Sequence, residues 1–141
     1  EGLTTEGQEN KIIFIADDSA VARNQVKKAL TSLGLEIELA KNGLEALNRL
    51  KEIAEEYGDV TNRVGVLVSD IEMPEMDGYT LTAEIKNTPE LQKLHVVLHT
   101  SLSGVFNQAI VQKVGADDFI AKFHPDELAT AVQKWLMTEC E

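Results

Sequence analysis

The feature that most constrains the fold is the run Val64–Ser69, which is apolar almost throughout and is followed at once by Asp70. A short run without polar alternation is typical of a strand buried on both faces, as in a parallel sheet covered by helices. Open sheets of this kind place their functional groups outside the carboxyl ends of the strands. The sequence therefore predicts that Asp70 lies at an active edge.

Three other short apolar runs also end in groups suited to chemistry. These groups are the pair Asp17–Asp18, the hydroxyl of Thr100 and the ammonium of Lys122. Because the carboxyl ends of parallel strands meet at one edge, we expect the four sites to converge. Three carboxylates, a hydroxyl and an ammonium together suit a magnesium ion, a nucleophile and a transferable phosphoryl group.

Apolar runs alternate with segments of helical period along most of the chain. The predicted strands lie at 12–15, 35–39, 64–69, 96–98 and 119–121. Apolar residues at helical spacing lie at 22–33, 47–57, 81–85, 106–114 and 125–136, and residues 58–63 read as a polar loop. This alternation predicts a doubly wound α/β fold of five strands and five helices around a five-stranded parallel sheet.

Length and charge limit the range of functions. The 141 residues, 43% of them apolar, are enough for one domain with a real core. The formal net charge of -11 argues against nucleic acid and against anionic membranes as partners, and no stretch is long and apolar enough to insert into a membrane. The single cysteine, Cys140, cannot form an internal disulfide, which favours a reducing cytoplasm. The polar residues 1–10 are interpreted as a flexible linker or leader before a domain spanning 11–138.

Each candidate group also has a simpler explanation. The pair Asp17–Asp18 precedes a helix, whose dipole favours acidic residues at its start. Asp70 could be an ordinary loop residue, Thr100 an ordinary strand residue and Lys122 a solvated lysine. However, three carboxylates roughly 5 Å apart would repel by about 3 kcal/mol per pair at an effective dielectric near 20, so a cation is expected among them. The joint appearance of these groups at strand ends favours the functional interpretation. The three histidines, His95, His99 and His124, have no recognisable metal-ligand spacing.

These residues resemble the CheY-like receiver domain of two-component response regulators. The motifs concerned are Asp17–Asp18, Ala40–Ala46, Asp70 followed by Met73–Pro74 and Met76–Gly78, Thr100 and Lys122. The resemblance implies a flavodoxin-like (βα)5 fold in which Asp70 accepts phosphate from a histidine kinase. It implies that Asp17, Asp18, Asp70 and the Glu72 backbone carbonyl hold Mg²⁺, while Thr100 and Lys122 bind the phosphoryl group. It further implies that Phe119 is an aromatic switch residue that rotates when Thr100 moves, and that the domain catalyses only its own phosphorylation and dephosphorylation.

Two segments, Val97–Gly104 and Lys122–Leu128, are similar to the receiver of the CheV family of chemotaxis coupling proteins, where it follows a CheW-like domain. That resemblance implies a CheA-like kinase as phosphate donor, and a CheW-like domain and chemoreceptor complex as partners. A free-standing CheY-like regulator or a phosphate sink is the alternative within the family.

Two other classes of protein share parts of the pattern. A phosphatase of the haloacid dehalogenase type also combines an aspartate nucleophile, a hydroxyl, a lysine and an acidic pair, but it places its nucleophile after the first strand. A flavodoxin-like carrier of flavin mononucleotide would need a hydroxyl-rich loop where this chain has Asp17–Asp18. Turnover of a small phosphoester would indicate the phosphatase, and a yellow colour the flavin carrier.

Overall fold

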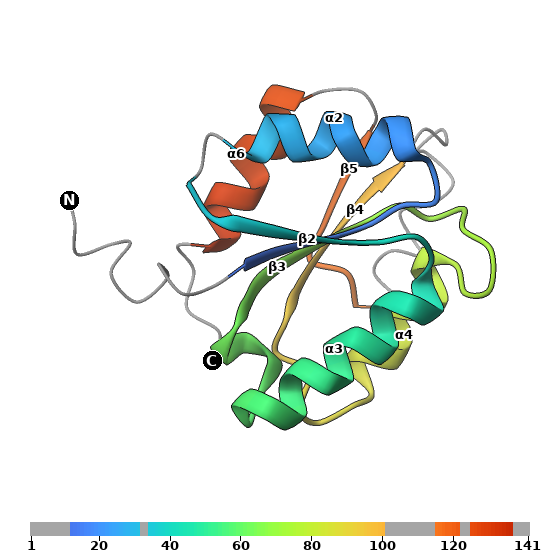
Figure 1. Cartoon of the computed structure of the whole chain (residues 1–141), viewed down its shortest axis with the longest axis vertical. Helices are drawn as coiled ribbons and strands as arrows, with labels where there is room; N and C mark the ends of the chain where they lie inside the picture. Colours follow the sequence, from blue (N-terminus) through green and yellow to red (C-terminus); the bar gives the residue numbers. More distant parts are fainter. Residues whose placement is uncertain (1–11, 32–33, 101–114, 122–124, 137–141) are drawn as a thin grey trace.

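In the described residues the protein is a three-layer α/β structure, with a parallel sheet between two layers of helices (Figure 1). The computed structural model describes residues 12–31, 34–100, 115–121 and 125–136. In chain order the elements are β1 (Ile12–Ala16), α2 (Ala20–Thr31), β2 (Glu36–Ala40), α3 (Gly43–Tyr57), the 3-10 helix η1 (Val60–Asn62), β3 (Val64–Ser69), α4 (Gly78–Lys86), β4 (His95–Thr100), β5 (Asp118–Ala121) and α6 (Pro125–Leu136). In Figure 1, α2 and α6 cover one face of the sheet, and α3 and α4 cover the other.

The sheet has the strand order β2-β1-β3-β4-β5, and all its paired strands are parallel. The chain therefore moves outward from β1 to β2, then crosses back and continues on the other side of β1. The strand order reverses between β1 and β3, and in sheets of this type ligands bind outside the carboxyl ends of the strands at such a point.

The buried strands supply two separate cores, one on each face. Every residue of β1 and β3 is buried. Because strand side chains alternate between faces, Phe14 packs on the α3/α4 side whereas Ile13 and Ile15 pack on the α2/α6 side. A fully buried aliphatic or aromatic side chain contributes about 1.5–3 kcal/mol, so these cores stabilise the sheet that positions the strand ends.

Helices α2, α3 and α4 begin at the carboxyl edge of the sheet, and each has a side chain that caps its first turn. Ser19 Oγ accepts a hydrogen bond from the Ala22 amide before α2. The side chains of Asn42 and Asp77 accept from the amides of Glu45 and Thr80 at the starts of α3 and α4. Caps of this kind contribute about 1 kcal/mol each and fix the points at which the loops leave the sheet.

The predicted fold class is confirmed, including the five-stranded parallel sheet. The interpretation of residues 58–63 as a purely polar loop is wrong, because the segment contains η1 and the side chain of Val60 is completely buried. The Val60 amide donates to the carbonyl of Glu90, which ties this turn to the segment between α4 and β4. The helix expected over 106–114 lies outside the described residues. In the part of the chain that the structure describes, no helix could cross a membrane.

Candidate functional site

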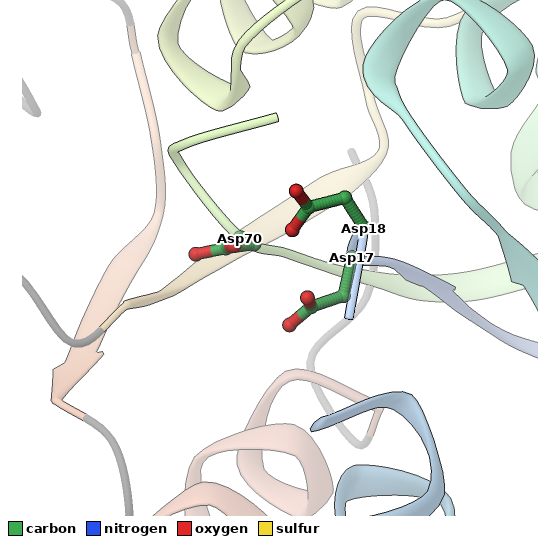
Figure 2. A group of neighbouring side chains, drawn as sticks. All are labelled: Asp17, Asp18 and Asp70. Carbon is green, nitrogen blue, oxygen red and sulfur yellow. The ribbon is translucent and has the colours of Figure 1, made fainter. Parts of the chain in front are cut away.

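Three aspartates meet where the strand order reverses. Asp17 and Asp18 directly follow β1, and Asp70 directly follows β3, the neighbouring strand. One carboxylate oxygen from each lies within 4.8 Å of the others. Figure 2 shows the three side chains gathered at this edge, between the start of α2 and the loop that leaves β3. The convergence expected for these three residues is therefore present in the structure.

Hydrogen bonds fix the amide, the side chain and the carbonyl of Asp17. The Asp17 amide donates to the Ala40 carbonyl of β2 at 3.1 Å, and Asp17 Oδ1 accepts from the Ser19 amide at 2.9 Å. The Asp17 carbonyl accepts from Arg23 Nη1 at 2.7 Å. The side chain of Asp17 is buried, whereas Asp18 is exposed. The pair therefore combines a fixed carboxylate with one that faces solvent.

Asp70 is oriented by the strand that precedes it and by its own loop. Its amide donates to the Ala16 carbonyl of β1 at 2.8 Å, which continues the ladder by one residue beyond the strands. Its Oδ1 accepts from the Ile71 amide at 2.8 Å, and its carbonyl accepts from Ser69 Oγ at 2.7 Å. The residue is 8% exposed, so its carboxylate lies at the floor of the site rather than on the open surface.

The loop from Ile71 to Asp77 packs closely against its surroundings at two glycines. The Gly78 amide donates to the Ile71 carbonyl at 2.8 Å, and a Cβ at Gly78 would overlap the Asp70 carbonyl. The Gly43 amide donates to the Met76 carbonyl at 3.1 Å, and a Cβ there would overlap that carbonyl. Both positions require glycine because backbone fills the space that a side chain would occupy. Glu72 lies in this loop with an exposed side chain.

The charge of the site needs a counter-ion. Unit charges 4.8 Å apart repel by about 3 kcal/mol at an effective dielectric of 20, and three carboxylates make three such pairs. Hard cations such as Mg²⁺ and Ca²⁺ are bound by oxygen ligands alone, whereas zinc and copper sites include nitrogen or sulfur ligands in most cases. The donor set therefore fits a hard divalent cation.

Of the other predicted site residues, the structure describes Thr100 and Phe119. Thr100 is the last residue of β4, paired with Ala121 at the same edge of the sheet as the aspartates. Lys122 lies outside the described residues. Phe119 lies in β5 opposite Leu98 and packs, partly buried, against the core on the α3/α4 side.

Arg23 did not stand out in the sequence, because an arginine one turn into a helix is ordinary. The only available signal was its spacing of four residues from the capping Ser19, which directs it back toward the helix start. The fold brings its guanidinium to the Asp17 carbonyl, where Nη1 donates a hydrogen bond.

A second polar cluster lies at the opposite end of the sheet. Asp117 Oδ2 accepts from the Val96 amide at 2.7 Å and pairs with Lys86 Nζ at 3.3 Å, and Asp117 Oδ1 lies 3.7 Å from His95 Nδ1. Burial acts to raise the pKa of Asp117, but the contact with His95, the hydrogen bond from the Val96 amide and the charge of Lys86 outweigh it, so the net pKa is lowered. The His95 ring also packs on Trp135, with centroids 4.7 Å apart. This cluster joins α4 and α6 to the sheet.

Comparison with known proteins agrees with this geometry. The model of the response regulator receiver domain matches residues 13–133. Chemotaxis protein CheV3 of Helicobacter pylori is 30% identical over 129 residues, which are 91% of this chain and 41% of the relative. Chemotaxis protein CheV1 of the same bacterium is 32% identical over 127 residues, covering 90% and 38%. The chain thus spans about two fifths of the length of these relatives.

Comparison with solved structures also finds a receiver domain with the same fold. The signal receiver domain of a signal transduction histidine kinase from Syntrophus aciditrophicus superimposes with a TM-score of 0.76 and 33% sequence identity. The match covers 93% of this chain and 96% of that one, so the likeness extends over the whole sheet and its helices.

Proposed function

This chain belongs to the response regulator receiver domain family, and we propose that it accepts a phosphoryl group on Asp70 from a histidine kinase. The family predicted from the sequence motifs is thereby confirmed, and it is a family of signalling domains rather than of ordinary enzymes. The observation that supports phosphoryl transfer is the cluster of Asp17, Asp18 and Asp70, whose carboxylate oxygens lie within 4.8 Å at the carboxyl edge of the sheet.

In the proposed reaction Asp70 is the nucleophile. A carboxylate oxygen of Asp70 attacks the phosphorus of a phosphohistidine, the phosphorus–nitrogen bond breaks, and the departing imidazole nitrogen keeps the electron pair and takes up a proton. The Ile71 amide, 2.8 Å from Asp70 Oδ1, holds the carboxylate in one orientation for this attack.

Asp17, Asp18, Asp70 and the Glu72 backbone carbonyl are proposed to hold Mg²⁺. When bound, Mg²⁺ would supply positive charge beside the phosphoryl oxygens. The buried Asp17 is fixed by three hydrogen bonds, whereas the exposed Asp18 can adjust to an incoming ion.

The switch is proposed to pass from the phosphoryl group to the β4–β5 side of the sheet. The Thr100 hydroxyl and the Lys122 ammonium bind the phosphoryl oxygens, and movement of Thr100 leaves space into which Phe119 rotates. Phe119 suits this role because it is only partly buried and lies opposite Leu98 on the strand that ends in Thr100. A ligand shifts such an equilibrium only by its differential affinity for the two states.

Chemotaxis is the proposed context, because the two Helicobacter relatives are chemotaxis proteins. The donor is then a CheA-like kinase, and the regulated partners are a CheW-like domain and a chemoreceptor complex. The net charge of -11 favours protein partners over nucleic acid, and a cytoplasmic location is part of the same proposal.

The test is labelling with a small phosphodonor such as acetyl phosphate. We expect intact mass spectrometry to show one added phosphoryl group, only when a divalent cation is present, and none in Asp70→Asn. Asp77→Asn is the matched control, because asparagine also caps a helix well and Asp77 serves as the N-cap of α4. Equal labelling of Asp70→Asn would show that the site is wrong, and steady turnover of simple phosphoesters would indicate a phosphatase instead.

A further inference from the structure

Arg23 makes a hydrogen bond at the centre of the acidic loop. Its Nη1 donates to the Asp17 carbonyl at 2.7 Å, and that carbonyl belongs to the peptide bond joining Asp17 to Asp18. A guanidinium bond to a carbonyl is charge-assisted and stronger than a bond between neutral groups. Rotation of this peptide would redirect both neighbouring side chains, so the contact constrains the two carboxylates together.

The Asp17 carbonyl lies in the short junction between β1 and α2. The Asp17 amide is still bonded to β2 through Ala40, whereas the intrahelical bonds of α2 begin with the Arg23 amide and the Ser19 carbonyl. Asp17, Asp18 and Ser19 therefore belong to neither β1 nor α2. Backbone carbonyls in buried turns are almost always satisfied, and here the side chain of Arg23, itself half-buried, does this.

From this geometry we infer that Arg23 is a positioning residue for the metal site: it fixes the Asp17–Asp18 peptide so that both carboxylates point toward Asp70. This inference rests on the proposed function, because it assumes that the three aspartates bind a divalent cation. Arg23 acts through the loop and has no assigned contact with the ion or the phosphoryl group.

A purely electrostatic role and a positioning role for Arg23 predict opposite changes in Mg²⁺ affinity when its side chain is removed. If the guanidinium acted only through its positive charge, it would repel Mg²⁺, and its removal would tighten binding. If it orients the carboxylates, its removal weakens binding, as occurs when residues that orient metal ligands are replaced, typically by 10–100-fold. The sign of the change therefore distinguishes the two roles.

The experiment measures Mg²⁺ affinity by isothermal titration calorimetry for the unaltered chain, Arg23→Ala, Arg23→Lys and Lys28→Ala. We expect Arg23→Ala to bind Mg²⁺ roughly 10-fold or more weakly. Lys28→Ala is the matched control, because it removes the same charge from the exposed surface of α2 without a contact to the acidic loop. It should bind Mg²⁺ as the unaltered chain does, or slightly more tightly.

Arg23→Lys keeps a donor and a charge but not the planar fork, so we expect it to recover part of the lost affinity. It also keeps the inference testable if Arg23→Ala unfolds. A second readout is the Mg²⁺ dependence of labelling by acetyl phosphate. In both Arg23 variants the midpoint should move to higher Mg²⁺ by the same factor as the affinity, with little loss at saturating Mg²⁺.

The results separate the two proposals. If the unaltered chain binds no Mg²⁺, the proposed function fails and this inference fails with it. If the unaltered chain binds Mg²⁺ and the Arg23 variants bind it equally or more tightly, only the positioning role is overturned. A lower plateau of labelling with an unchanged midpoint also overturns it, because Arg23 would then act on the phosphoryl step.

Discussion

Replacement of Asp18 by asparagine should stabilise the metal-free protein. Asp18 participates in two of the three carboxylate pairs, each worth about 3 kcal/mol at 4.8 Å and an effective dielectric of 20. Its exposure reduces this toward the value of about 1 kcal/mol or less that is common for fully exposed pairs, although here the two partners, Asp17 and Asp70, are buried. Two pairs at between about 0.5 and 1.5 kcal/mol give an expected gain of about 1–3 kcal/mol in the free energy of unfolding.

The assay is thermal unfolding in buffer with a chelator, followed by circular dichroism. For a domain of this size a gain of 1–3 kcal/mol raises Tm by roughly 3–10 °C. The gain should shrink as salt is added, because screening weakens the repulsion that the substitution removes. Glu90→Gln is the control, since it removes one negative charge from an exposed turn before β4, away from the acidic cluster.

Saturating Mg²⁺ should make the unaltered chain more stable than Asp18→Asn. An ion that binds only the folded state stabilises it by about 2.7 kcal/mol at one hundred times its Kd, and Asp18→Asn should lose most of that gain. A Tm for Asp18→Asn equal to or below that of the unaltered chain in metal-free buffer would refute the reasoning. It would mean that the three carboxylates do not repel in the folded protein.

Three further predictions concern other parts of the fold. Asp117→Asn should lower the free energy of unfolding by about 1–3 kcal/mol at neutral pH, since Asp117 accepts a hydrogen bond from the Val96 amide, pairs with Lys86 and lies 3.7 Å from His95 Nδ1. Because folding lowers the pKa of Asp117 below its usual 3.8, the stability that Asp117 supplies is present above that value and disappears as pH falls through the lower folded pKa. In urea unfolding, the loss of stability caused by Asp117→Asn should therefore shrink in acid. A loss that stays constant with pH would contradict this. Gly78→Ala should slow labelling of Asp70 by up to about 100-fold through displacement of its carbonyl, with folding checked by circular dichroism; normal labelling would show that the loop tolerates the added Cβ. Beryllofluoride, a stand-in for the phosphoryl group, should alter amide hydrogen exchange around Phe119 as well as near Asp70, and changes limited to the acidic loops would exclude the proposed switch.

Much of the architecture was predictable because it depends on local patterns. Uninterrupted apolar runs such as Val64–Ser69 are typical of strands buried on both faces, and the structure buries every residue of that run. The residues that follow these strands could also be identified from the sequence, since each apolar run shows where its strand ends. The burial of Val60 was missed because its neighbours are polar, and only packing in the core on the α3/α4 side removes it from water.

The sequence by itself determined which groups lie at the carboxyl edge, because the direction of every strand in a parallel sheet follows from the alternation of strands and helices. It did not determine which strands are neighbours. The order β2-β1-β3-β4-β5 depends on pairing between segments far apart in the chain, and the adjacency of β1 and β3 in it places Asp17 and Asp18 beside Asp70. The contact of Arg23 with the Asp17 carbonyl likewise depends on how α2 leaves β1. Local patterns specify elements and their polarity, whereas the free energy that selects their arrangement comes from burial and hydrogen bonding between distant residues, which tertiary structure alone decides.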